Sequence, residues 1–331
     1  MILVYARAAI GRWMAITITQ LSAFLAVVRG GSVTAAADEL VVTQPSVSAA
    51  IAALERELGC DLLARAGRGV ALTEAGRTFA PYAEDVLGLL SGGARAAREA
   101  AAVAAQRLQI AAVTTAAESF VPTLMRAFTE RHPDVELSLV VGNRTSVLDR
   151  VLAHSADVAI SGTPPSDPRL LAEPLTENEI VCIAGAGDPA AAGRPVTGAA
   201  LAGRVWLLRE PGSGTRSLNE EYLRDEGLEP RTLTLGSNGA IKQAARAGLG
   251  ISLLSRDAVR DELAAGGLTE IRLRRGPPTR PWFVLRSAVG PGRAPVEQFL
   301  DFLRGSVAGH RVVPRTLDSE SRGVRRRRSR P

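Results

Sequence analysis

Apolar residues recur at helical spacing early in the chain, in two stretches between residues 32 and 58. Ser32 and Thr43 stand just before the two stretches as N-cap residues, and Pro45 suits a first helical turn. Both stretches follow the i, i+3, i+4, i+7 rule of one buried helix face, with Val33, Ala36, Ala37 and Leu40 in the first and Val47, Ala50, Ile51, Leu54 and Leu58 in the second. The pattern predicts two short helices joined by a tight turn, a helix-turn-helix. A capped amphipathic pair inside any helical bundle would show the same pattern.

The flanking segments extend this helical unit. Thr17 and Gln20 have the spacing of a capping box, and Gly59 can close the second helix in the left-handed conformation. Short apolar runs at 62–63 and 70–72 bracket a glycine-rich basic tip at 64–69. They predict a two-stranded wing, with a solvated basic loop as the alternative.

A long helix is predicted next, capped by Thr73 and reaching to about Ala105. Its apolar positions alternate at spacings of three and four, which is typical of a coiled-coil seam; they are Ala75, Phe79, Tyr82, Val86 and Leu89 or Leu90. The pair Gly92-Gly93 is expected to weaken its middle.

From Arg107 the pattern changes to strands alternating with helices. Strands at 108–113, 135–141 and 157–160 with helices at 119–131 and 147–152 predict a mostly parallel sheet covered on both faces. A second α/β unit is predicted from strands at 180–184, 205–208, 233–235, 250–254 and 268–273 and helices ending at Leu223 and spanning 238–247. A strand at 282–285 and a helix around 296–303 are expected to return to the first unit.

The N-terminal motifs resemble those of the LysR-type transcriptional regulators. The resemblance is carried by residues 24–28 (Phe-Leu-Ala-Val-Val), 31–37 (Gly-Ser-Val-Thr-Ala-Ala-Ala), 43–48 (Thr-Gln-Pro-Ser-Val-Ser), 54–55 (Leu-Glu), 58–59 (Leu-Gly) and 72–76 (Leu-Thr-Glu-Ala-Gly). It implies an α/β fold class with an all-α-type winged helix-turn-helix at the N-terminus, a long linker helix that pairs two subunits, and a two-lobed periplasmic-binding-protein-like effector domain. It also implies a dimer or tetramer on an interrupted palindrome, a small-molecule co-inducer, and RNA polymerase as a further candidate partner.

The domain boundaries expected on this basis follow the changes in pattern. They are 1–14 as a disordered extension, 15–72 as the DNA-binding domain, 73–105 as the linker and dimerisation helix, 106–305 as the effector-binding domain and 306–331 as a basic disordered tail. Within the effector-binding domain, lobe 1 takes 106–179 and 282–305, and lobe 2 takes 180–281. The tail could add DNA affinity or simply be a solvated terminus.

The first turn of the second helix suits the floor of a DNA groove, because its side chains offer donors and acceptors without charge. We expect Gln44, Pro45 and Ser46 to face bases, while Ser48, Arg65 and Arg68 face the phosphate backbone. Thr34 and Thr43 complete the expected DNA-binding set of the winged helix-turn-helix.

Polar segments follow several predicted strands, at the sheet edge where ligands of open α/β sheets bind. They predict a site for a small anion between the lobes, with candidate contacts Thr114, Thr115, Asn143, Thr145, Ser161, Gly162, Ser213, Thr215, Arg216, Ser237 and Asn238. Each Ser, Thr or Asn is also an ordinary helix cap. Arg216 fits either a carboxylate clamp or an ion pair with Glu220 one turn later.

Composition narrows the function further. The formal net charge is +6, but residues 314–331 alone hold seven arginines against two carboxylates, and Lys242 is the one lysine. Abundant arginine is therefore weak evidence for DNA binding, and position has to carry that argument. No run approaches the length of a membrane span, and a cytoplasmic protein without a membrane partner is expected.

No enzymatic motif is found. The Gly212-Ser213-Gly214-Thr215 segment lacks the Lys-Ser/Thr of a P-loop, and Glu118 and Asp157 look like isolated carboxylates. Cys60 and Cys182 are expected to be buried free thiols, and His132, His154 and His310 lack metal-ligand spacing, so no metal or cofactor is expected. A solute-binding or enzymatic α/β protein with a helical assembly domain stays the alternative.

Overall fold

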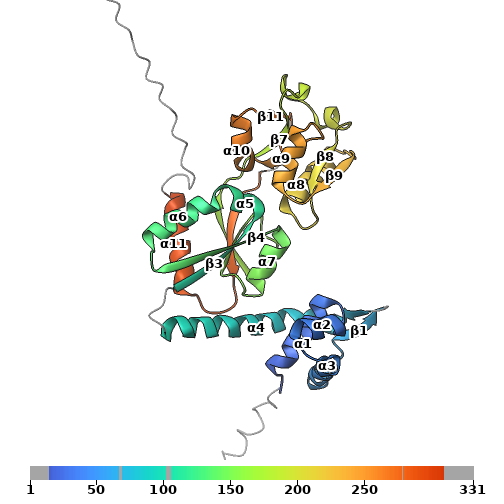
Figure 1. Cartoon of the computed structure of the whole chain (residues 1–331), viewed down its shortest axis with the longest axis vertical. Coiled ribbons are helices and arrows are strands. Elements are labelled where there is room, and N and C mark those ends of the chain that lie inside the picture. Colours follow the sequence, from blue (N-terminus) through green and yellow to red (C-terminus); the bar gives the residue numbers. More distant parts are fainter. Residues whose placement is uncertain (1–14, 67–68, 102–105, 278, 309–331) are drawn as a thin grey trace, which may run out of the picture.

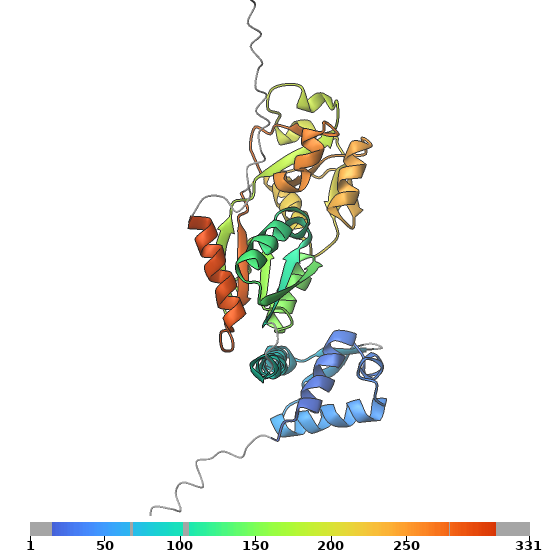
Figure 2. The same ribbon diagram turned by 60° about the vertical axis from the view of Figure 1, so that its left-hand side comes forward.

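The computed structural model of the chain describes residues 15–66, 69–101, 106–277 and 279–308. A small N-terminal domain is joined by the long helix α4 to a two-lobed α/β part (Figure 1). In Figure 2, turned by 60°, α4 is seen end on beside the lower lobe, with the N-terminal domain to one side. Among the described residues, no helix combines the length and the apolar composition that crossing a bilayer would require. The extension at 1–14, Arg68, His310 and most of the basic tail lie outside the described residues.

The N-terminal domain contains three helices and a two-stranded sheet, namely α1 (Ile18–Gly30), α2 (Val33–Leu40), α3 (Gln44–Leu58), β1 (Leu63–Ala66) and β2 (Gly69–Leu72). The predicted caps are confirmed: Thr17 and Gln20 form a capping box, and Ser32 and Thr43 accept hydrogen bonds from the first turns of α2 and α3. Gly59 closes α3 at a φ of 72°. Local hydrogen bonds therefore set every boundary of the helix-turn-helix.

The core of this domain explains why the helices pack as they do. Phe24 of α1 and Leu54 of α3 are both fully buried, and Phe24 lies 5.8 Å from the Phe79 ring of α4. The Glu55 carboxylate accepts hydrogen bonds from the backbone amides of Leu62 and Leu63, which ties α3 to the wing. The strands β1 and β2 pair antiparallel and run further toward the tip than the sequence predicted, because 64–66 and Gly69 also pair.

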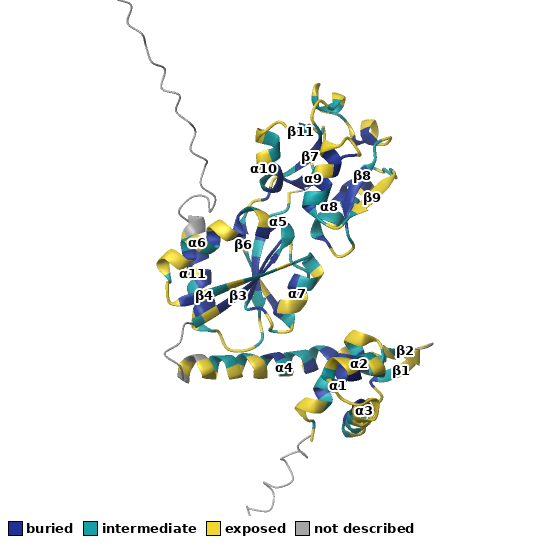
Figure 3. Ribbon diagram, viewed as in Figure 1, coloured by how far each residue is buried: buried dark blue, intermediate teal, exposed yellow. Residues whose placement is uncertain are grey.

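Helix α4 (Glu74–Ala101) begins where predicted, and the Thr73 hydroxyl accepts a hydrogen bond from the Gly76 amide. Its predicted end falls at 102–105, outside the described residues. The helix is uninterrupted at Gly92 and Gly93, so the expected weakening does not appear as a break. The predicted seam is split: Ala75 and Phe79 pack into the N-terminal core, whereas Tyr82, Val86 and Leu90 are exposed (Figure 3).

Lobe 1 is a five-stranded sheet in the order β4-β3-β5-β12-β6. Its strands are β3 (Gln106–Val113), β4 (Val135–Gly142), β5 (Val158–Ser161), β6 (Leu170–Thr176) and β12 (Trp282–Ser287), and its helices are α5 (Thr114–Ser119), α6 (Val121–Arg131), α7 (Arg144–Leu152) and α11 (Ala294–Ala308). Strand β3 pairs parallel with β4 and β5, but β12 pairs antiparallel with β5 and β6. The sheet is therefore mixed rather than mostly parallel, because β12 enters from the other lobe.

Two elements of lobe 1 were missing from the sequence prediction. Strand β6 has the burial pattern of a half-exposed edge, and Pro174 within it is tolerated only at such an edge. Helix α5 has no side-chain cap, so the Thr114-Thr115 segment opens a helix where the sequence indicated only the end of a strand.

Lobe 2 contains a three-stranded antiparallel sheet, β10-β7-β11, and a parallel pair, β8-β9. Its elements are β7 (Ile180–Gly185), η2 (Pro189–Ala191), η3 (Gly198–Leu201), β8 (Trp206–Arg209), α8 (Gly214–Asp225), β9 (Thr232–Leu235), α9 (Asn238–Arg246), β10 (Ser252–Ser255), α10 (Arg256–Ala264) and β11 (Leu268–Ile271). Helix α10 was not predicted, because only Ala258 and Val259 of it are buried. The chain crosses between the lobes after β6 and again before β12.

Two expectations about single residues, Cys60 and Asp157, are wrong. Cys60 is exposed, because it follows the end of α3 at the surface. Cys182 is buried as expected, and this burial raises the pKa of its thiol to about 12. Asp157 is not isolated, because its carboxylate contacts Arg95 and Arg293 and accepts a hydrogen bond from the Gln109 amide.

Candidate DNA-binding surface and effector cleft

The N-terminal turn of α3 presents the predicted contacts to solvent. Thr43, Gln44, Pro45, Ser46 and Ser48 are all exposed, so a partner can reach them. The Thr43 hydroxyl caps the helix and lies 2.8 Å from the Ser46 hydroxyl. These two side chains are therefore held in place before any partner arrives, which lowers the entropy cost of binding.

The remaining DNA candidates flank that turn. Thr34 is exposed on α2, and Arg65 is exposed on β1 of the wing. Between α2 and α3, Val41 is 90% exposed and has a φ of 56°, which is a rare conformation for a β-branched residue. Such strain is concentrated at functional turns.

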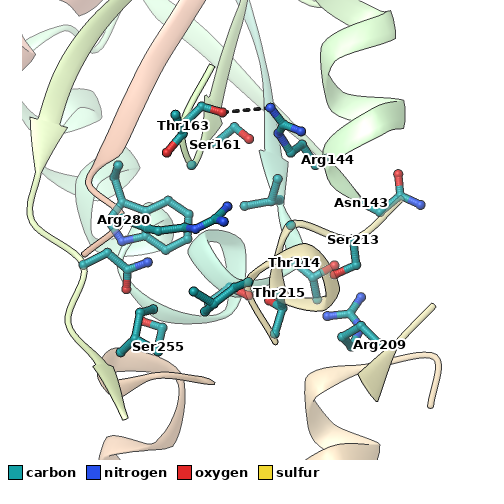
Figure 4. Close-up of a pocket in the computed structure, with 18 of the residues that line it drawn as sticks. Thr114, Asn143, Arg144, Ser161, Thr163, Arg209, Ser213, Thr215, Ser255 and Arg280 are labelled. Carbon is teal, nitrogen blue, oxygen red and sulfur yellow. Dashed lines mark hydrogen bonds between the residues drawn. The ribbon is translucent and has the colours of Figure 1, made fainter. Parts of the chain in front are cut away.

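A cavity of about 60 Å³ lies between the lobes, and Figure 4 shows the side chains around it. The predicted contacts that line it are Thr114, Thr115, Asn143, Ser161, Gly162, Ser213 and Thr215. They come from the ends of β3, β4 and β5 in lobe 1 and from the start of α8 in lobe 2. Residues about 100 positions apart in the chain thus meet at this cavity, as their predicted place at the sheet edge implies.

Four predicted contacts do not line this cavity. Arg216 donates to Glu220 at 2.7 Å and to the Arg209 carbonyl, so the ion-pair alternative describes it. Ser237 caps α9 by accepting from the Ala240 amide. Thr145 and Asn238 instead join the two lobes.

Two hydrogen bonds cross between the lobes at these positions. The Asn238 amide group donates to the Thr115 hydroxyl at 2.9 Å, and the Thr145 amide donates to the Gly212 carbonyl at 3.4 Å. Asn238 in turn accepts from Arg209, and both side chains are buried. This polar chain holds the lobes together because each buried group depends on the next for its partner.

Sequence reasoning missed the charged lining. Arg144 belongs to the polar segment at 143–145 that follows the second predicted strand, but it was not counted among the candidate contacts. Arg209 ends β8, and Arg280 lies in the crossing segment before β12. Thr163 ends the polar segment at 161–163 that follows the third predicted strand, but it was not counted among the candidate contacts. Asn178 and Ser255, which also line the cavity, were missed.

Arg144 and Arg280 reach the cavity from different sides (Figure 4). Arg144 donates to the Thr163 carbonyl at 3.0 Å, and Arg280 is paired with Glu221 of α8. Burial and the neighbouring Arg280 lower the pKa of Arg144. The charge of Arg144 is therefore held in the cleft at a cost that an anion bound beside it would relieve.

Several residues that line the same cavity carry buried polar atoms without hydrogen-bond partners among the described residues. These atoms are the Ser161 and Ser255 hydroxyls, the Asn178 side-chain carbonyl and the Trp282 indole nitrogen. Native proteins leave few such groups unpaired, and a bound polar molecule is one way to satisfy them. Together with the two arginines, they make a cleft suited to a small anion that carries hydroxyl or carboxyl groups.

Comparison with protein families matches both parts of the chain. Residues 18–77 match the model described as "Bacterial regulatory helix-turn-helix protein, lysR family", and residues 101–308 match the "LysR substrate binding domain". The HTH-type transcriptional regulator CbbR of Rhodospirillum rubrum is 38% identical over 87% of this chain and 95% of its own length. The RuBisCO operon transcriptional regulator of Allochromatium vinosum is 35% identical over 82% of this chain and 90% of its own length.

Solved structures agree with this match. The regulatory domain of Synechocystis CcmR in complex with 2-PG is 34% identical, with a TM-score of 0.58 over 60% of this chain and 96% of that domain. Full-length CbnR in complex with its target DNA is 24% identical, with a TM-score of 0.55 over 87% of this chain and 99% of CbnR. The likeness to CbnR shows that the whole arrangement of domains is a known fold.

Proposed function

This chain belongs to the LysR-type transcriptional regulators, which are DNA-binding proteins with an effector-binding domain and not enzymes, and we propose that its effector is a small phosphorylated carboxylate. The observation that carries the proposal is that Arg144 and Arg280 both line one cleft, together with several buried polar groups that have no partner among the described residues. The complex of the Synechocystis domain with 2-PG supports the same ligand class. Two guanidinium groups suit the phosphate, because each presents planar donors that match phosphate oxygens.

The division of the chain follows from this proposal. Residues 15–72 bind DNA, 73–105 contain the linker and dimerisation helix α4, and 106–305 bind the effector. In the last part, 106–179 with 282–305 form lobe 1 and 180–281 form lobe 2. The exposed side chains of Tyr82, Val86 and Leu90 support pairing of α4 with a second subunit in a dimer or tetramer.

Effector binding and DNA binding are coupled through lobe closure. The effector bridges Arg144 of lobe 1 and Arg280 at the edge of lobe 2, so it binds one closure of the lobes more tightly than another. Because a ligand shifts an equilibrium only by its difference in affinity, this bridging is the required source of that difference. The closure then sets the spacing of two DNA-binding domains on an interrupted palindrome.

Calorimetry on the full-length protein tests the effector class. The expected result is that 2-PG binds, inorganic phosphate binds more weakly, and acetate binds weakest. Arg144→Met should weaken the binding of 2-PG by about 10- to 100-fold, which corresponds to the usual contribution of charge-assisted hydrogen bonds. Arg216→Met is the matched control, because this arginine is paired with Glu220 away from the cavity. Equal losses for both variants would contradict the proposal.

A fluorescence-anisotropy titration tests how the DNA is read. Gln44→Ala should weaken a cognate site, such as the intergenic DNA beside the gene, by about 1–3 kcal/mol and leave random DNA nearly unchanged. Arg65→Gln should weaken both DNAs and reduce the salt slope by about one. Gln243→Ala, exposed on lobe 2, is the control. An equal loss on cognate and random DNA for Gln44→Ala would contradict a base-reading role.

A further inference from the structure

A second cavity, of about 300 Å³, lies between α4 and lobe 1. It is separate from the interlobe cleft and shares no lining residue with it. Its walls come from α4, the turn before β5, the end of β12 and the start of α11. Its volume is in the range of small-molecule sites and is larger than that of the cleft between the lobes.

Three glycines on α4 account for the close contact between this helix and lobe 1 and for the cavity beside that contact. At Gly88 an added Cβ would lie 2.5 Å from the His154 ring and 2.8 Å from the Ala153 carbonyl oxygen, so α4 and lobe 1 touch closely there. At Gly92 and Gly93 an added Cβ would meet nothing within 4 Å. The helix therefore touches lobe 1 at its middle and leaves open space one turn further on.

The charged groups of this cavity are mostly cationic. Arg95, Arg286 and Arg293 line it, against the carboxylates of Asp157 and Glu297. Asp157, whose side chain is 6% exposed, already accepts from Arg95 at 3.3 Å and from Arg293 at 2.5 Å. The Nε groups of Arg95 and Arg286 are shielded from solvent and have no acceptor among the described residues. Two buried donors, one from α4 and one from β12, thus lack an acceptor, and an anionic group would supply one.

The rest of the wall is apolar. Leu89, Val289 and Val296 face the same space, together with the small side chain of Ala96. Inorganic phosphate would leave these surfaces wet, whereas a carbon chain would remove them from water. The cavity therefore favours one anionic group joined to an apolar body.

We propose that this cavity is a second ligand site, which binds a small organic anion between the linker helix and lobe 1. The anionic group accepts from Arg95 of α4 and Arg286 of β12, while Asp157 keeps its own contacts. The ligand bridges the two parts beside the close contact of Gly88 with His154 and the 3.2 Å contact of His154 with Asp85. Its binding stabilises the docking of α4, the helix that carries the DNA-binding domain, on lobe 1.

Hexanoate is a suitable probe for the full-length protein, measured by calorimetry and by hydrogen exchange of α4. We expect hexanoate to bind and to slow exchange around residues 88–96, whereas 1-hexanol and inorganic phosphate bind at least about tenfold more weakly. Arg95→Met should weaken hexanoate by about tenfold or more. Arg98→Met is the matched control, because Arg98 is exposed on the same helix and does not line the cavity.

Gly92→Leu provides an independent variant, because it fills the open space without removing any charge. It should abolish hexanoate binding, while Gly92→Ala should retain it. Arg144→Met should leave hexanoate binding unchanged, which separates this site from the interlobe cleft. Retained binding in folded Gly92→Leu, equal binding of 1-hexanol, or loss in Arg144→Met would each overturn the proposal.

Discussion

The turn at the start of α3, which we propose contacts DNA, and the interlobe cleft are built in opposite ways. The exposed residues at the start of α3 come from one continuous segment, and the caps that shape it connect residues three positions apart. The cleft collects Arg144, Ser161, Asn178, Arg209 and Arg280 from segments of both lobes. The first site exists wherever α3 forms, whereas the second exists only when two lobes fold and approach each other.

The difference extends to how polar groups are satisfied. At the start of α3 the side chains are exposed, so water can form hydrogen bonds with them when no partner is bound. In the cleft the buried groups depend on one another, as in the chain Thr115, Asn238 and Arg209, or remain unpartnered. A substitution at the start of α3 should therefore affect few other groups. A substitution in the cleft should also change the hydrogen bonding of residues in the other lobe.

The largest effect on stability is expected from removing one buried aromatic ring from one core at a time. Phe24→Ala removes a fully buried ring from the N-terminal core and should destabilise that domain by about 3–5 kcal/mol. DNA binding should be lost while calorimetry still detects 2-PG. Phe299→Ala, at an equally buried ring in lobe 1, should produce the reverse loss. If Phe24→Ala also abolished effector binding, the two regions would not be energetically separate.

A smaller effect is expected from cutting the polar chain between the lobes. Thr115→Val keeps the shape but leaves the buried Asn238 amide without its acceptor, at a cost of about 1–3 kcal/mol. Urea unfolding of the full-length protein measures it. The double variant Thr115→Val with Asn238→Leu should lose less free energy of unfolding than the two single variants lose in sum. Strict additivity would argue against a coupled chain.

The helix cap tests the local side of the comparison. Thr43→Ala removes the N-cap of α3 and should lower the free energy of unfolding by about 0.5–2 kcal/mol. Thr34→Ala, at an exposed site on α2, should change it by less than about 0.5 kcal/mol. Effector affinity should be the same in both variants. Equal stability losses at the two threonines would show that the cap has no special role.

The smallest effect concerns an ion pair within lobe 2. Arg204 lowers the pKa of Asp188 below its ordinary value of 3.8, and the Asp188 side chain is 9% exposed. A lowered pKa in the folded state stabilises the protein above the unfolded value and loses this contribution as pH falls through the folded value. Asp188→Asn should therefore cost about 1 kcal/mol at neutral pH, and this cost should shrink as the pH falls through the lowered pKa of the folded state. A cost that grew toward acid would contradict this sign.

Elements held by interactions between near neighbours in the chain could be predicted from the sequence, and elements that depend on distant segments mostly could not. The helix-turn-helix was predictable because Thr17, Ser32, Thr43 and Gly59 act on residues within a turn of themselves. Strand β6 and helix α10 were not, because β6 is an edge that β12 completes from more than 100 residues away, and α10 buries little. The strand ends of the cleft were found because parallel strands deliver their carboxyl ends to one edge.

The sequence by itself determined the helices of the helix-turn-helix, their caps and the uncharged turn at the start of α3, since each rests on hydrogen bonds between near neighbours. The tertiary structure alone decided that Arg144 and Arg280 face one cleft while Arg216 pairs with Glu220, and that Asp157 joins α4 to lobe 1. The physical reason is that a guanidinium group reaches many partners from one backbone position. Which partner it takes depends on burial and charge contributed by distant segments.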